Sequence, residues 1–184
     1  MEKIVSAFNK KAEISLCNSL GEILKERYPV FICIGSDLVL GDSLGPLVGT
    51  LLKKKYSNAL IYGTLNYPIT AKEISYAKEY ISKAHPNSLI IAIDAAIGEE
   101  DDIGLIKIRD KGIKPGLGVN KDLEEIGDIS IISIVASKSQ NHINLYNLTR
   151  LNLVYKVAET ISNGIDLYLK QIENMRLFNI VGAE

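Results

Sequence analysis

Two aspartates lie where this sequence can bring carboxyl groups together for chemistry. Asp42 lies in the run Gly41-Asp-Ser-Leu-Gly-Pro46, and Asp94 ends the apolar run Ser88–Asp94. Short apolar runs bounded by glycine or proline are typical of buried strands, and open α/β sheets bind ligands beyond the carboxyl ends of such strands. We therefore expect Asp42 and Asp94 to lie close together at one edge of a sheet.

Two carboxyl groups in one cleft do not ionise independently. The charge of one disfavours the charge of the other, so one pKa rises and the pair shares a proton. The ionised member can then activate a water molecule while the protonated member protonates a leaving group, which is general acid–base hydrolysis. The same oxygen atoms, with Asp37 as a third ligand, could instead hold a hard cation such as Mg²⁺. The residue types leave both alternatives open.

Each of these acids also has a structural interpretation. Asp42 or Ser43 can cap the helix that the following residues predict, because both side chains accept hydrogen bonds from helix N–H groups. Asp37 follows Gly35 and Ser36 and can cap a turn. Asp94 would be charged at the end of an apolar run, so it needs either a hydrogen-bonding partner or a place at the sheet edge.

A glycine-rich segment, Asp110–Gly118, is expected to border the substrate cleft, because glycine lets the backbone approach a ligand closely. Its candidate cleft residues are Gly112, Lys114, Pro115, Gly116 and Gly118. The alternative is an ordinary surface loop. The segment lacks the Gly-Lys-Ser/Thr of a phosphate-binding loop, and the residues after Gly35 lack the Gly-x-Gly-x-x-Gly dinucleotide pattern. No histidine stands beside an obvious nucleophile, so serine- or cysteine-type catalysis is not supported.

Alternating helical and strand patterns predict one α/β domain over residues 1–184, with a doubly wound, mostly parallel sheet. Strands are expected at residues 30–34, 59–62, 88–93, 104–108 and 129–136. Helices are expected in an N-terminal helical segment at 1–27, at 44–56 and 70–84, and at 143–175 with a break allowed at Gly164. The first three strands should be parallel neighbours, because helices separate them. Residues 98–130 are less regular and can carry an antiparallel hairpin.

The composition is that of an ordinary globular protein. The chain has 184 residues, of which 47% are hydrophobic and 23% are charged, with a net charge of −1. A net charge this small produces no overall positive potential that would attract nucleic acid or an anionic membrane. Two histidines and two cysteines are too few and too scattered for a tetrahedral zinc site. The N-terminus has no signal-peptide pattern. We expect a cytoplasmic protein with no metal, cofactor, nucleic-acid partner or membrane span.

Six short blocks of the sequence resemble one protein family. They are Cys33-Ile-Gly-Ser-Asp37, Gly41-Asp-Ser-Leu-Gly-Pro46, Ile93-Asp-Ala-Ala-Ile-Gly98, Pro115-Gly-Leu-Gly-Val119, Gly127-Asp-Ile-Ser130 and Asn147-Leu-Thr-Arg-Leu151. Together they resemble the YyaC family of sporulation proteins, often described as spore proteases. The resemblance spans residues 25–160, and the block that contains Asp42 is its most specific part.

The YyaC family is similar to the germination protease of spore formers and, more distantly, to hydrogenase maturation endopeptidases. This resemblance implies a three-layer α/β/α sandwich of the hydrogenase-maturation-protease and phosphorylase/hydrolase-like kind. It also implies an endopeptidase whose catalytic aspartates match Asp42 and Asp94. Asp37 and Ser43, which lie beside them in the sequence, are the candidates for supporting residues. In hydrogenase proteases a glutamate, an aspartate and a histidine bind metal. Here the aspartate matches Asp94, but Ser43 takes the glutamate position and the glycine-rich loop has no histidine.

The resemblance also implies partners and a compartment. The substrate would be a protein or peptide, such as a small spore protein, in the forespore or mother cell of a spore former. Self-association into a homo-oligomer is compatible with the sequence. The alternative is a non-catalytic, sporulation-associated binding protein on the same scaffold. Residues 137–144 depart from the family, because they are polar where relatives carry an apolar, glycine-containing segment.

Overall fold

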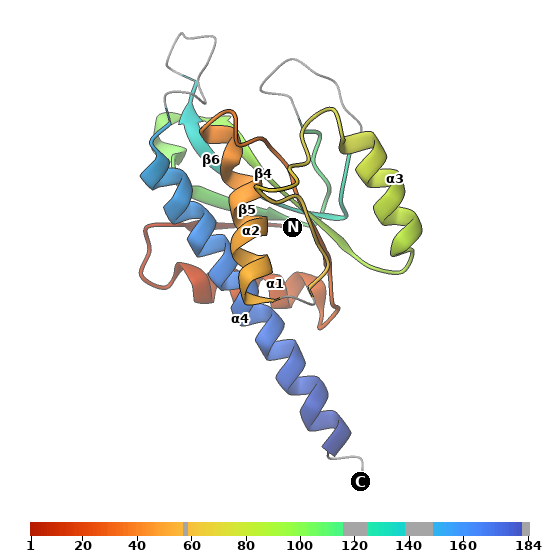
Figure 1. Ribbon diagram of the computed structural model, residues 1–184. Helices are drawn as coiled ribbons and strands as arrows, with labels where there is room; N and C mark the ends of the chain where they lie inside the picture. Colours follow the sequence, from red (N-terminus) through yellow and green to blue (C-terminus); the bar gives the residue numbers. More distant parts are fainter. Residues whose placement is uncertain (57–58, 116–124, 139–148, 182–184) are drawn as a thin grey trace.

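The computed structural model describes residues 1–56, 59–115, 125–138 and 149–181, and these form one six-stranded sheet flanked by helices (Figure 1). The strands are β1 (Glu2–Ser6), β2 (Val30–Cys33), β3 (Ile61–Tyr62), β4 (Ile90–Gly98), β5 (Leu105–Arg109) and β6 (Ile129–Ser137). Their order in the sheet is β1-β5-β6-β4-β2-β3. Strands β3, β2, β4 and β6 run parallel, whereas β5 is antiparallel to both β6 and β1. The predicted parallel arrangement of β2, β3 and β4 is therefore confirmed.

The helices cover both faces of the sheet. They are α1 (Ala12–Leu24), α2 (Leu44–Lys55), α3 (Ile74–Ala84) and α4 (Leu151–Val181). Alternate residues of the central strands enter two separate hydrophobic clusters. Phe31 and Ile93 pack with α1, α2 and α4, whereas Ile32 and Ala92 pack with α3. This burial on both faces is characteristic of parallel sheets, and it confirms the expected α/β fold with a layer of helices on each side.

The structure differs from the sequence-based prediction at the start of the chain and at the start of α3. Residues Glu2–Ser6 lie in the segment expected to be helical, but they form β1, because they pair with β5 from far along the chain. Helix α3 begins at Ile74 rather than at Thr70. Thr70 and Glu73 do interact as a capping box would, with the Thr70 N–H donating to the Glu73 carboxylate at 3.0 Å, but they do so in the turn before the helix.

The last helix, α4, is continuous through Gly164, so the break allowed there does not occur. A Cβ atom added at Gly164 would lie 2.5 Å from a methyl carbon of Leu16 in α1. This glycine therefore serves the close packing of α1 on α4. Residues 143–148 of the expected helix lie outside the described residues. In Figure 1 the C-terminal part of α4 extends beyond the sheet. None of the described helices combines the length and hydropathy needed to cross a membrane.

A tight contact fixes the start of α2 against the end of β2. A Cβ atom added at Gly45 would lie 2.0 Å from the carbonyl oxygen of Ile34. Backbone cannot yield as a flexible side chain can, so we expect Gly45→Ala to lower the free energy of unfolding by about 3 kcal/mol. Gly21→Ala in α1 is the control, because an added Cβ meets nothing within 4 Å there. That change should stabilise the protein by about 0.5–1 kcal/mol. Urea unfolding measures the stability of both variants. A Gly45→Ala protein as stable as wild type would contradict this packing.

Candidate active site

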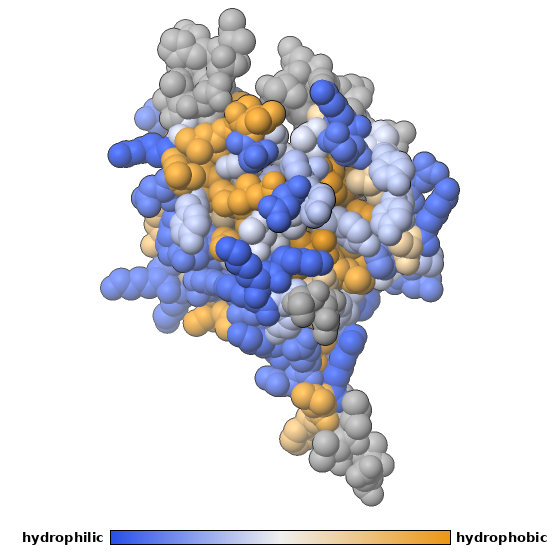
Figure 2. Space-filling view, in the orientation of Figure 1, coloured by the Kyte–Doolittle hydropathy of each residue, from blue (hydrophilic) through white to orange (hydrophobic). Residues whose placement is uncertain are grey.

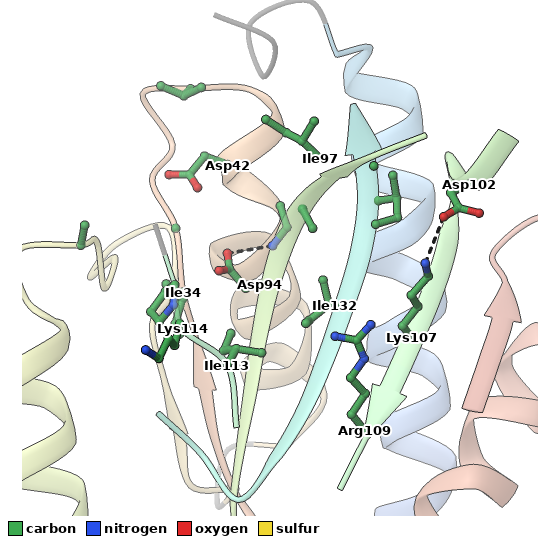
Figure 3. Close-up of a pocket in the computed structure, with 18 of the residues that line it drawn as sticks. Ile34, Asp42, Asp94, Ile97, Asp102, Lys107, Arg109, Ile113, Lys114 and Ile132 are labelled. Carbon is green, nitrogen blue, oxygen red and sulfur yellow. Dashed lines mark hydrogen bonds and ion pairs between the residues drawn. The ribbon is translucent and has the colours of Figure 1, made fainter. Parts of the chain in front are cut away.

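A cavity of about 720 Å³ lies at the carboxyl ends of the parallel strands β2 and β4 (Figure 3). The loop after β2, the start of α3 and the strands β4, β5 and β6 contribute to its wall. Asp42 and Asp94 both line it. On the face seen in Figure 2, the largest hydrophobic patch lies at the upper left, near the upper ends of α2 and α4, and smaller patches lie elsewhere on that face. The structure therefore brings the two aspartates into one cavity, at the sheet edge where the sequence predicts them.

Asp94 lies on the part of β4 that extends beyond β2. The pairing of these strands ends with Cys33 opposite Ile93, whereas β4 continues to Gly98. The prediction that Asp94 ends its own strand is therefore wrong, but Asp94 still lies at an edge, because its neighbour β2 has ended. Its Oδ1 atom accepts a hydrogen bond from the Ala95 backbone N–H at 2.8 Å. The remaining hydrogen-bonding capacity of this carboxyl group faces the cavity that Asp94 lines.

Asp42 is carried by a 3₁₀ turn, Gly41–Ser43, at the entrance to α2. Gly35 allows the preceding loop to close, because it has a φ of +137° and an added Cβ would lie 2.0 Å from the Asp42 carbonyl oxygen. The Ser36 N–H donates to that carbonyl at 3.1 Å. The start of α2 has no side-chain capping hydrogen bond, so Asp42 is not a helix cap. Its carboxyl group instead faces the cavity, on the same side as Asp94 (Figure 3).

Both carboxyl groups of the pair have raised pKa values. Burial is the main cause for Asp94, the negative charge of Asp42 adds to it, and the hydrogen bond from Ala95 opposes it, so the pKa of Asp94 lies well above its usual range. Burial also raises the pKa of Asp42, against a smaller lowering by the Ser36 backbone. A pair of this kind holds a proton that isolated carboxyl groups would release, which is what acid–base catalysis by two carboxyl groups requires.

The two supporting residues expected from the sequence do not join the pair. Asp37 is exposed and does not line the cavity. Ser43 is buried, and its Oγ donates to the Leu40 carbonyl at 2.6 Å, so its role in this structure is to hold the turn. The alternative cation site built from three aspartates is therefore not assembled. Among the described residues, no group of three or more His, Cys, Asp or Glu is arranged to hold a metal ion.

Part of the predicted cleft loop does border the cavity. Lys114 and Pro115 line it, as does the neighbouring Ile113, whereas Gly112 does not. A Cβ atom added at Gly112 would lie 2.4 Å from the carbonyl oxygen of Gly127, so this glycine serves backbone packing. The remaining candidates, Gly116 and Gly118, lie outside the described residues.

The sequence reasoning missed the cationic end of the cavity. Lys107 and Arg109 of β5 line it opposite the aspartates (Figure 3). Lys107 pairs with Asp102 at 3.0 Å, and Arg109 pairs with Glu2 of β1. The signal was present in β5, because its lysine and arginine alternate with buried isoleucines and so share one face of the sheet. Which cavity that face lines depends on strand order, which the sequence pattern does not contain.

Sequence comparisons place this chain among known relatives. A family model described as "Protein of unknown function (DUF1256)" matches residues 4–164. The uncharacterised protein YyaC of Bacillus subtilis (strain 168) is 43% identical over 140 residues, which are 75% of this chain and 68% of that protein. The resemblance to the YyaC family is therefore confirmed.

The structural comparison concerns the fold. The chain resembles the solved structure of a [NiFe] hydrogenase maturation protease, HycI from Thermococcus kodakarensis KOD1, with a TM-score of 0.56 and 19% sequence identity. The likeness covers 83% of this chain and 99% of that chain. The expected hydrogenase-maturation-protease-like fold is therefore confirmed, and at this identity the likeness establishes the fold alone.

Proposed function

The chain belongs to the DUF1256 family, and we propose that it is a peptidase in which Asp42 and Asp94 hydrolyse a peptide bond. The observation that carries this proposal is the pair itself, two partly buried carboxyl groups with raised pKa values in one cavity. Perturbed acids in a cavity are characteristic of functional sites. Burying two acids near each other is unfavourable for folding, and a role in catalysis accounts for keeping them.

The two acids have different roles in the proposed reaction. Asp94 holds the shared proton, because the charge of Asp42 adds to burial in raising its pKa. Ionised Asp42 accepts a proton from water as the water oxygen attacks the peptide carbonyl carbon. Asp94 then donates its proton to the amide nitrogen while the C–N bond breaks, which gives a carboxylic acid and an amine. A proton passes from Asp42 back to Asp94, and the pair is restored.

The relatives add support of a limited kind. HycI is named a maturation protease, and this chain shares its fold. Since a fold hosts many activities, that likeness supports a peptidase only in combination with the aspartate pair. The similarity of the Asp42 and Asp94 blocks to the germination protease favours a substrate among spore proteins, in spore formation or germination. Small spore proteins are therefore the first proteins to test as substrates.

Peptide cleavage can be tested without knowing the substrate. The purified chain is incubated with a peptide mixture made from a bacterial cell extract, and with spore-protein extract, and new peptide termini are identified by mass spectrometry. We expect cleavage at a restricted set of sites. Asp37→Asn is the matched control, because Asp37 lies on the same loop as Asp42 but does not line the cavity, so this variant should cleave as wild type does. Absence of new termini in both mixtures would contradict the peptidase and favour a binding protein on this scaffold.

A further inference from the structure

One row of side chains crosses three strands and joins the acid pair to a cation. Asp94 of β4 pairs with Ile132 of β6, and Ile132 pairs with Lys107 of β5. Residues that are directly paired across strands point to the same face of a sheet, and all three line the cavity (Figure 3). The cavity floor therefore changes along this row from acidic to apolar to cationic.

The length of this row can be compared with the length of a peptide. Neighbouring strands lie about 4.8 Å apart, so the Cα atoms of Asp94 and Lys107 are separated by about 10 Å. An extended peptide advances about 3.3 Å per residue. A peptide whose reacting bond lies beside Asp94 therefore reaches Lys107 about three residues further along. The two residues in between would lie over apolar Ile132, with Ile97 and Ile134 also lining the cavity.

Lys107 is held at this end of the row but keeps binding capacity. Its side chain is 19% exposed and donates to Asp102 at 3.0 Å. An ammonium group has three donors, so one carboxylate does not satisfy Lys107 fully. Other cations lie nearby with acids of their own. Arg109 lines the same wall, and Lys138 at the exposed rim pairs with Glu99 at 3.7 Å. Lys107 is the cation that shares a row with Asp94.

We propose that the Lys107 end of the cavity binds a carboxylate of the peptide substrate, about three residues from the bond beside Asp94. This inference rests on the proposed function, because it assigns the substrate class of the same cavity. The carboxylate is either an Asp or Glu side chain or the free end of a peptide. Both present the same acceptor oxygens to an ammonium group.

Binding tests this inference without requiring turnover. The Asp94→Asn protein is titrated with three peptides that share a central leucine. One has Glu as the third residue after the leucine, one has Gln there, and one ends at that position with a free carboxylate; the first two have blocked ends. We expect the two carboxylate peptides, or one of them, to bind about fivefold more tightly than the Gln peptide. The comparison of the two carboxylate peptides shows whether the site binds a side-chain carboxylate or the free carboxylate at the end of a peptide.

Variants of the ion pair separate a binding role from a structural one. Lys107→Met should abolish the preference for a carboxylate, and Lys107→Arg should retain it, because arginine keeps the charge. Asp102→Asn should strengthen the preference, because it removes the carboxylate that competes for Lys107. A purely structural ion pair would give no such gain. Lys170→Met is the matched control, since the exposed Lys170 forms an ion pair with Asp166 on α4 outside the cavity.

The outcomes for this inference and for the peptidase are distinct. Equal affinity for all three peptides, including no binding of any, would overturn the carboxylate site, as would a preference that survives Lys107→Met. Cleavage of the peptide mixture with no enrichment of carboxylates near the cut would also overturn it, and would leave the peptidase in place. A carboxylate preference in a wild-type protein that cleaves nothing would remove the peptidase and keep the site.

Discussion

Asp94→Asn is expected to remain folded and to lose peptide cleavage by about 10²-fold to 10⁴-fold, the usual contribution of a general acid or base. Asparagine has nearly the same shape and can still accept the hydrogen bond from the Ala95 N–H. It cannot release a proton to the leaving nitrogen, so the loss should fall on kcat. The measurement is kcat/KM and kcat for a peptide that contains the best cleavage site found in the peptide mixture, with the circular dichroism spectrum as a check on folding.

The same substitution should change how stability depends on pH. The pKa of Asp94 is raised in the folded protein by burial and by the charge of Asp42. The folded state therefore binds the proton more tightly than the unfolded state. The contribution of Asp94 to the free energy of unfolding is therefore largest below the ordinary carboxyl range and is lost as pH rises through the raised pKa. Asparagine has no such titration, so the difference in stability between Asp94→Asn and wild type should grow in favour of the variant with rising pH. Urea unfolding across a pH series measures this, and parallel curves for the two proteins would contradict it.

Asp42→Asn is expected to lower cleavage by about 10²-fold or more, because it removes the group that accepts the proton of the attacking water. The fold should lose little, since Asp42 makes no capping hydrogen bond at α2. The variant should also lower the pKa of Asp94, because the like charge of Asp42 is gone, although burial keeps it raised. Carboxyl carbon chemical shifts of Asp94 followed through a pH titration report this change.

Full activity in a folded Asp42→Asn protein would exclude Asp42 from the reaction. An unchanged pKa of Asp94 in that protein would show that the two carboxyl groups are not coupled. Asp37→Asn serves both measurements as the control, because it removes an exposed acid from the same loop without touching the cavity wall.

The sequence predicted that Asp42 and Asp94 lie together, because the position of each follows from local patterns. Each comes after a short apolar run, and parallel strands end at a common edge. The end of β4 was not predictable in the same way. Small and apolar residues continue after Asp94, so the sequence pattern does not show whether the strand ends there or at Gly98. The strand continues to Gly98 because its residues pair with β6.

Features that depend on distant partners were the ones that sequence patterns did not predict. Strand β1 is short and forms only because it pairs with β5, about a hundred residues later. Gly164 looks like a helix break until the close approach of Leu16 is known. The row from Asp94 to Lys107 likewise requires the register of three strands, two of them joined in antiparallel order. Local propensity contains none of this information.

The pH dependence of cleavage tests the shared-proton mechanism most directly. The reaction needs one carboxyl group ionised and the other protonated, so kcat/KM should be bell-shaped in pH, and its two limbs report the coupled pair. Because the pKa of Asp94 is raised well above the usual carboxyl range, the falling limb should lie above that range, and Asp42→Asn should shift it to lower pH in any residual activity. A rate that rises with pH to a plateau, with no falling limb, would contradict the shared-proton mechanism.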